Sequence, residues 1–189
     1  MTVKIAFIGT HGTGKTTRAY ELCQALSKRG YRVTFNEEIA RKCPLPINEN
    51  SPLETEDWIL SAEIKHEVES SYKYEVVVCD RSVLDSFAYK QYRIGENNPR
   101  TLMWKTLVRE WMKTYTHLFY TPPNDAYWVE DGTRSLNQAF RANVDALLVK
   151  LIQEFTPDNL STYVSVDDCL KIILPELEEK KLARLNVRR

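Results

Sequence analysis

One short segment restricts the fold of this chain more than any other part of it. The eight residues from position 9 run Gly9-Thr10-His11-Gly12-Thr13-Gly14-Lys15-Thr16, which fits the pattern G-x-x-x-x-G-K-[S/T]. The mostly apolar run 3–8 before it, which is rich in β-branched residues, predicts a strand. After Lys15, apolar residues recur at helical spacing until Gly30, a residue type that commonly ends helices. The chain therefore begins with a strand, a glycine-rich bend and a helix.

Each residue type in this bend suits contact with a phosphate. Glycines let the backbone curl round an anion with its N–H groups pointing inward, and the following helix directs the positive end of its dipole at the same oxygens. Lys15 can reach the β- and γ-phosphates, and the Thr16 hydroxyl can bind Mg²⁺. We therefore predict a phosphate-binding loop, or P-loop, that binds ATP with Mg²⁺. The predicted nucleotide-binding residues here are Gly9, Thr10, His11, Gly12, Thr13, Gly14, Lys15, Thr16 and Thr17.

An acidic residue at the end of a second apolar run is the expected partner of the metal. Asp80 follows the run 76–79, which suits a central parallel strand covered on both faces. Ligands of such sheets bind beyond the carboxyl ends of the strands, so a carboxylate there faces the crevice. Asp80 and Thr16 are the predicted metal ligands. The alternative is that Asp80 caps a turn or the next helix.

Strand and helix patterns alternate along the rest of the chain. Further strands are expected at 31–37, 76–79, 117–121 and 162–166. Helices are expected at 53–74, 83–92 and 101–115, from about 136 to 151, and after Asp167 as a capping residue. On the 53–74 helix, Leu60, Ile64, Val68 and Tyr72 should share one face. This order predicts one α/β domain over 1–189, with the three-layer P-loop NTPase fold, a mostly parallel five-stranded sheet and a small helical lid at about 124–141.

Composition narrows the class of protein. Lys plus Arg and Asp plus Glu both total 26, and this balance disfavours a dedicated nucleic-acid binder. No apolar run approaches the ~18 residues that a membrane span needs, and the start of the chain lacks a signal-type segment, so a cytoplasmic protein is expected. The cysteines are scattered without a C-x-x-C pair and are expected to be reduced and buried. They are Cys23, Cys43, Cys79 and Cys169.

Two further segments resemble known kinases. The segment 80–89, which begins Asp80-Arg81-Ser82, resembles the Asp-Arg segment of nucleotide and nucleoside kinases, notably the thymidylate kinase family. Glu38-Ile39-Ala40-Arg41 and Asp131-Gly132-x-Arg134 are similar to the kinase family that contains the nicotinamide riboside kinase domain. The resemblance extends over most of the chain, and its specific motifs are the P-loop and Asp-Arg-Ser. Ile39 departs from thymidylate kinases, which usually have proline there.

The resemblance implies roles for several side chains. Arg81 would hold a phosphate, and Glu38 would accept a hydrogen bond from the acceptor's sugar hydroxyl or act as its base. Arg134 would close over the phosphates from the lid, helped by Arg141 two turns along the helix. The predicted catalytic residues are thus Lys15, Glu38, Asp80, Arg81 and Arg134, with Arg134 and Arg141 also binding the nucleotide.

Some of these assignments have competitors. Glu37 is adjacent to Glu38, and side chains alternate along a strand, so which glutamate faces the site is open. Four aromatic residues could stack on a planar acceptor or belong to the core. They are Trp58, Phe87, Tyr89 and Trp104.

The resulting hypothesis is an ATP- and Mg²⁺-dependent kinase that transfers the γ-phosphoryl group to a nucleoside- or nucleotide-like small molecule. A homodimer is compatible with it. Two alternatives remain: a nucleotide-binding switch or sensor that engages a protein or lipid partner, and a polynucleotide 5′-kinase, which the neutral charge disfavours. The guanine-reading tetrapeptide Asn-Lys-x-Asp of GTPases is absent from the sequence.

Overall fold

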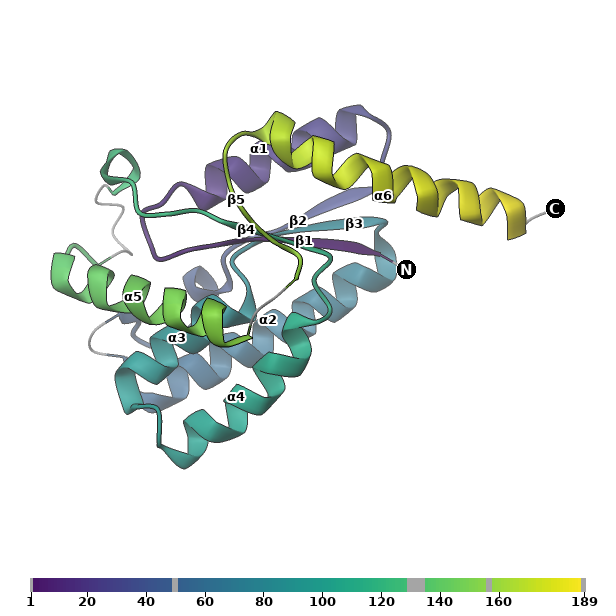
Figure 1. Cartoon of the computed structure of the whole chain (residues 1–189). Helices are drawn as coiled ribbons and strands as arrows, with labels where there is room; N and C mark the ends of the chain where they lie inside the picture. Colours follow the sequence, from purple (N-terminus) through teal and green to yellow (C-terminus); the bar gives the residue numbers. More distant parts are fainter. Residues whose placement is uncertain (1, 49–50, 129–134, 156–157, 188–189) are drawn as a thin grey trace.

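The structure is a computed structural model that describes residues 2–48, 51–128, 135–155 and 158–187. A five-stranded sheet forms its centre, and helices cover both faces (Figure 1). The strands are β1 (Val3–Ile8), β2 (Val33–Asn36), β3 (Val76–Asp80), β4 (His117–Tyr120) and β5 (Leu160–Thr162). The helices are α1 (Lys15–Lys28), α2 (Leu53–Lys73), α3 (Val83–Ile94), α4 (Pro99–Met112), α5 (Gln138–Phe155) and α6 (Val166–Val187), with short 3-10 helices η1 (Ile39–Lys42) and η3 (Asp125–Tyr127).

The sheet is parallel throughout, in the order β2-β3-β1-β4-β5. Helices α1 and α6 lie on one face of it, and α2 to α5 lie on the other (Figure 1). Because side chains alternate along a strand, β1 sends Ile5 and Phe7 to the first layer and Ala6 and Ile8 to the second. All six β1 residues are buried, as a strand covered on both faces requires. The predicted α/β class, parallel sheet and three layers are confirmed.

The fifth strand lies earlier than the sequence indicated. β5 is a three-residue edge strand, Leu160–Thr162, that pairs with Leu118 to Tyr120 of β4. The predicted strand at 162–166 is wrong beyond Thr162, because the strand ends there and α6 begins at Val166. The Ser165 hydroxyl accepts a hydrogen bond from the Asp168 N–H at 3.1 Å. Ser165, rather than Asp167, therefore caps this helix.

The buried face of α2 also differs from the predicted apolar stripe. Leu60 is buried, but the side chains of Val68 and Tyr72 are exposed to 54% and 92%. The inner face carries Glu67 instead, whose carboxylate accepts hydrogen bonds from Lys4 Nζ (2.7 Å), Trp111 Nε1 (2.8 Å) and the Tyr115 hydroxyl (2.6 Å). Such a buried carboxylate is tolerated because these donors compensate its desolvation.

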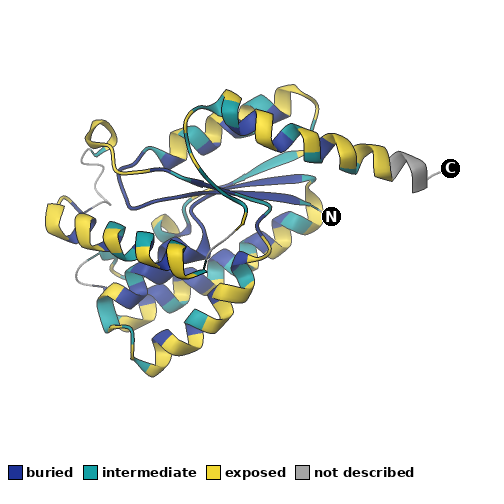
Figure 2. Cartoon of the chain, viewed as in Figure 1, coloured by how far each residue is buried: buried dark blue, intermediate teal, exposed yellow. Residues whose placement is uncertain are grey.

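Burial elsewhere follows the layers, with buried residues turned toward the sheet and exposed ones away from it (Figure 2). Cys79 and Cys169 are buried, Cys23 and Cys43 are half-buried, and all four are free thiols. None of the described helices is both long and apolar enough to cross a membrane. Within the proposed lid at 124–141, the structure describes η3 and the start of α5, while residues 129–134, Arg134 among them, lie outside the described residues.

Candidate active site

The glycine-rich bend connects β1 to α1 at the carboxyl edge of the sheet. Gly9 has a φ of +152° there, and a Cβ atom on it would lie 2.4 Å from the Thr121 carbonyl oxygen. Gly14 has a φ of +82° at the N-terminus of α1. A side chain would be strained at both positions because of the backbone conformation, and at Gly9 it would also lack space. The sequence places glycine where the curled loop needs it.

A carboxylate from α3 holds the start of this loop. Asp85 Oδ1 accepts the Gly9 N–H at 2.8 Å, and its Oδ2 accepts the Ser82 N–H at 2.9 Å. The Ser82 hydroxyl accepts the Leu84 N–H in turn, which completes a capping box at the N-terminus of α3. One side chain thus ties the P-loop to the first turn of α3. The sequence signal for it is the spacing Ser82-x-x-Asp85.

Lys15 is buried against its own loop. Its ammonium group donates to the Thr10 carbonyl oxygen at 2.6 Å and to the Thr13 hydroxyl at 3.3 Å. Burial, and next the nearby Arg81 cation, lower the pKa of Lys15 to about 7. A polyphosphate at the loop would supply the negative charge that restores a protonated lysine.

The two predicted metal ligands are in direct contact. The Thr16 hydroxyl donates to Asp80 Oδ2 at 2.6 Å, and Asp80 pairs with Phe7 in the sheet, so it stands level with the end of β1. Burial, followed by the Glu38 charge, raises the pKa of Asp80. Hydroxyl and carboxylate oxygens are ligands that suit Mg²⁺. Among the described residues no three His, Cys, Asp or Glu side chains gather as a metal site, so a bound Mg²⁺ would take further ligands from phosphates and water.

Next to the P-loop, Arg81 and Glu38 form a buried ion pair. Arg81 Nε donates to Glu38 Oε1 at 2.6 Å, and the side chains are exposed to only 8% and 13%. Glu38 Oε2 accepts from Arg41 Nε at 3.2 Å. Burial alone would raise the pKa of Glu38, but the charges of Arg81 and Lys15 outweigh it and lower that pKa to about 2. Glu38 is therefore a carboxylate over the whole neutral range.

Glu37 and Glu38 lie in different surroundings. The Glu37 side chain is 54% exposed and pairs with Lys42 Nζ at 2.6 Å. Glu38 instead lines a pocket that reaches the P-loop at His11. Of the two, the structure brings Glu38 to the side chains predicted to handle phosphate.

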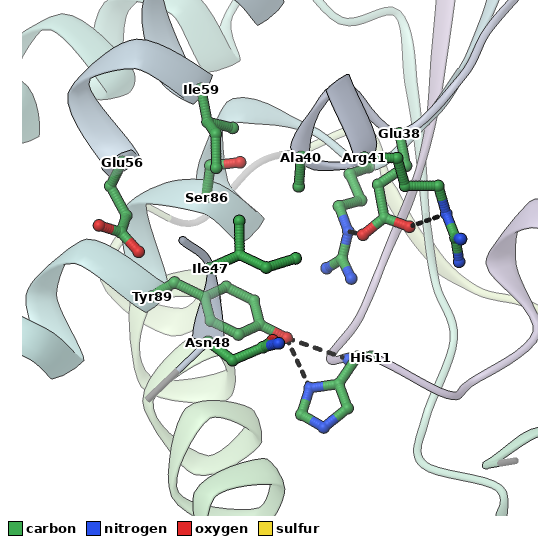
Figure 3. A pocket seen from close by; sticks show the side chains of 11 residues that line it. His11, Glu38, Ala40, Arg41, Ile47, Asn48, Glu56, Ile59, Ser86 and Tyr89 are labelled. Atoms are coloured by element: carbon green, nitrogen blue, oxygen red, sulfur yellow. Dashed lines mark hydrogen bonds and ion pairs between the residues drawn. The ribbon is translucent and has the colours of Figure 1, made fainter. Parts of the chain in front are cut away.

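This pocket, called the side pocket below, lies between η1, α2, α3 and the P-loop (Figure 3). Its lining residues are His11, Glu38, Ala40, Arg41, Ile47, Asn48, Glu56, Ile59, Arg81, Ser86 and Tyr89. Among the aromatic candidates, Tyr89 lines it, whereas Phe87 and Trp104 belong to the core and Trp58 is 36% exposed. Sequence reasoning missed Glu56 and the loop residues Ile47 and Asn48, because no motif marks them.

His11 and Arg141 secure the outer side of the P-loop. The Tyr89 hydroxyl lies 2.8 Å from His11 Nδ1, and the His11 ring stacks on Phe140. Arg141 donates to the carbonyl oxygens of His11 (3.2 Å) and Gly12 (3.1 Å), and also to Asp125 (2.7 Å). The structure thus places Arg141 on the backbone of the loop. Thr17, the last predicted loop residue, is exposed in the first turn of α1.

The strand order, the loop between β1 and α1, and the acidic end of β3 together define a P-loop α/β protein. Within this class the chain belongs to the AAA domain family, whose sequence model matches residues 4–160. No curated protein sequence matches the chain at a significant level.

Solved structures share the fold at low sequence identity. Thymidylate kinase from Ehrlichia chaffeensis aligns with a TM-score of 0.66 and 19% identity, over 91% of this chain and 98% of that one. Deoxyadenosine kinase from M. mycoides, solved with the products dCMP and a flexible dCDP, aligns with a TM-score of 0.63 and 16% identity, over 94% and 100%. NadR protein in complex with NR aligns with a TM-score of 0.70 and 18% identity, over 90% of this chain. The present chain spans about half (51%) of that NadR chain.

Proposed function

We propose that this protein is an ATP- and Mg²⁺-dependent kinase that transfers the γ-phosphoryl group to a hydroxyl of a nucleoside- or nucleotide-like small molecule. The observation that carries the proposal is the buried Glu38–Arg81 pair, which lies between the P-loop and the side pocket. A protein that only senses a triphosphate has no need of a carboxylate and a guanidinium buried beside a second pocket. Two of the aligned proteins are a nucleotide kinase and a nucleoside kinase, which supports the same conclusion.

Different residues would bind the phosphoryl donor and the acceptor molecule. The P-loop amides and Lys15 would hold the β- and γ-phosphates, and Thr16 with Asp80 would hold Mg²⁺, which neutralises phosphate charge when bound. Arg81 Nη1 lies 3.5 Å from the Gly9 carbonyl oxygen, so its guanidinium borders the loop and can stabilise charge on the transferring group. The side pocket would then place the acceptor hydroxyl beside these groups.

Glu38 is suited to orienting that hydroxyl. Its Oε2 is held by Arg41, whose side chain is 36% exposed, so an acceptor hydroxyl can replace this outer contact. With a pKa of about 2, Glu38 is a weak base. This suffices because phosphoryl transfer passes through a loose transition state in which the acceptor proton leaves late. The acceptor oxygen bonds to the γ-phosphorus, the bond to the β-phosphate oxygen breaks, ADP leaves, and the proton passes through Glu38 to water.

The test is a phosphorylation assay on a panel of nucleosides and nucleoside monophosphates. One group of acceptors should raise ADP release well above the rate with ATP alone and yield a phosphorylated product. Glu38→Gln and Arg81→Ala should lower kcat far more than they weaken ATP binding. Glu37→Gln is the matched control, since Glu37 pairs with Lys42 outside the side pocket. Equal, slow ATP hydrolysis with every acceptor would refute the proposal. Cytoplasmic location and a homodimer stay predictions.

A further inference from the structure

The side pocket has two ends with different chemistry. Glu38 and Arg81 border the P-loop at one end. Glu56, in the first turns of α2, lies on the other side of Tyr89 from Glu38 in the view of Figure 3. An acceptor whose hydroxyl reaches Glu38 would therefore extend the rest of its structure along Tyr89 and Ile59 toward Glu56.

Glu56 presents hydrogen-bond acceptors at this far end. The residue is only 6% exposed, and its Oε1 accepts from the Ser51 hydroxyl at 3.2 Å. A carboxylate has room for about four hydrogen bonds, so Ser51 leaves capacity for a ligand. The two cations close enough to influence Glu56 are engaged elsewhere: Lys90 binds Asp57, and Arg93 donates to the Ser51 carbonyl oxygen at 2.7 Å. A buried carboxylate with spare capacity favours a partner that brings N–H groups or positive charge.

Ser86 adds a second acceptor on the α3 wall. Its hydroxyl donates to Glu63 Oε1 at 2.7 Å, behind the wall of the pocket. Glu63 Oε2 is buried without a hydrogen-bond partner within the described residues. Burial raises the pKa of Glu63 well above its usual value, so a proton on Oε2 leaves Oε1 as the acceptor for Ser86. With Glu63 Oε1 as the acceptor, the Ser86 proton points away from the pocket, and the Ser86 lone pairs are left for a ligand.

The positive charges that line the side pocket are already compensated by negative charges. Arg41 and Arg81 both bind Glu38, and with Glu56 the pocket lining carries two cations and two anions. A nucleoside monophosphate would add about two negative charges next to a bound triphosphate. The guanidiniums of Arg41 and Arg81 would then be shared between Glu38 and the added phosphate. A neutral or cationic acceptor meets no such repulsion.

We propose that the acceptor is an unphosphorylated nucleoside whose base presents an N–H donor edge, and that Glu56 is the residue that selects it. The inference rests on the proposed kinase function and specifies its substrate class. Ser86 would accept from a second donor of the same molecule, and Tyr89 would contact the ring between them. A keto oxygen at that edge would face the Glu56 carboxylate with a second acceptor, so that only the neighbouring ring N–H could still donate to Glu56, and the keto compound should bind more weakly.

The experiment measures binding and turnover separately. Calorimetry without ATP compares adenosine and cytidine, which carry an amino group, with inosine and uridine, which carry a keto group at the same place, and with AMP and CMP. Amino nucleosides should bind about tenfold or more tightly than their keto counterparts. Glu56→Gln should abolish most of this preference, because the amide lacks the charge and can present either its carbonyl oxygen or its N–H groups to the ligand. A preference for keto nucleosides, or tighter binding of monophosphates, would overturn the inference.

Two control variants separate selection from folding. Ser51→Ala removes the internal hydrogen bond to Glu56 but not its carboxylate, and Glu54→Gln changes an exposed glutamate on the same turn that pairs with Arg100. Both should retain the amino preference, and loss of it in either would contradict the role of the Glu56 carboxylate. Preferred phosphorylation of AMP or CMP would refute this inference while leaving the kinase function intact. Selective binding of amino nucleosides with no phosphorylated product would refute the kinase function instead.

Discussion

Glu38→Gln gives a quantitative test of the charge arrangement at the site. The pKa of Glu38 is about 2 in the folded protein, against an unfolded value near 4.5. A group whose pKa is depressed by folding stabilises the protein above its unfolded pKa and loses that effect as the pH falls through its folded pKa. At about 1.4 kcal/mol per pKa unit, ionised Glu38 contributes roughly 3 kcal/mol at pH 7 and about 1 kcal/mol at pH 3.

The assay is urea unfolding followed by tryptophan fluorescence, for the wild type and for Glu38→Gln, between pH 7 and pH 3. The difference in the free energy of unfolding between the two proteins should shrink by about 2 kcal/mol over this range. Glu37→Gln is the control, because the Glu37 side chain is 54% exposed and its pair with Lys42 lies in solvent. A stability difference between wild type and Glu38→Gln that is constant from pH 7 to pH 3 would refute the coupling of Glu38 to Arg81 and Lys15.

Three further predictions concern the P-loop. Since the pKa of Lys15 is about 7 and a polyphosphate would raise it, ATP binding at pH 8 should take up close to one proton, which calorimetry in buffers of different ionisation heat measures; Lys15→Met should abolish this uptake, and binding without proton uptake would contradict the reasoning. Asp80→Asn should weaken ATP binding about tenfold or more with Mg²⁺ but little in EDTA, and an equal loss in both would exclude a metal role. Asp85→Ala should lower the free energy of unfolding by about 1–3 kcal/mol, because the Gly9 and Ser82 N–H groups lose their buried acceptor, and an unchanged melting curve would refute this.

The parts of the site that the sequence predicts are those close together in the chain. The loop from Gly9 to Thr16 needs particular residues at fixed spacing, because its backbone conformation determines its function. Asp80 could also be predicted from the sequence, because an apolar run followed by one acidic residue marks the end of a buried strand. The contact between Thr16 and Asp80 confirms that these two segments meet.

The remaining parts depend on packing between distant elements. Glu56 reaches the side pocket only because α2 packs against α3, and Asp85 reaches Gly9 only because α3 begins beside β1. The burial of α2 could not be predicted from its apolar residues for the same reason. Val68 is apolar but faces solvent, whereas Glu67 is buried because Lys4, Trp111 and Tyr115 meet it there. Hydrophobic periodicity cannot reveal a buried polar group whose partners come from other parts of the chain.

Arg81 belongs to a sequence motif and also depends on packing between distant elements. Its backbone conformation allows a test of its role. Its φ is +95°, a conformation that costs a residue with a side chain about 1–3 kcal/mol and costs glycine little. The Arg81 N–H stays bonded to the Phe7 carbonyl oxygen at 3.1 Å, so the strained residue is fixed to β1 while its guanidinium turns to Glu38. The interaction that lowers the pKa of Glu38 to about 2 is comparable in size to this strain.

Two variants of Arg81 separate the strain from the charge. Arg81→Ala and Arg81→Gly both remove the guanidinium, so both should lose turnover to a similar extent. Only glycine relieves the backbone, so Arg81→Gly should unfold at a higher urea concentration than Arg81→Ala, by about 1 kcal/mol in the free energy of unfolding. If the alanine variant were as stable as the glycine variant, the left-handed conformation would carry no cost. The presence of an arginine in this backbone conformation would then be no argument for its part in catalysis.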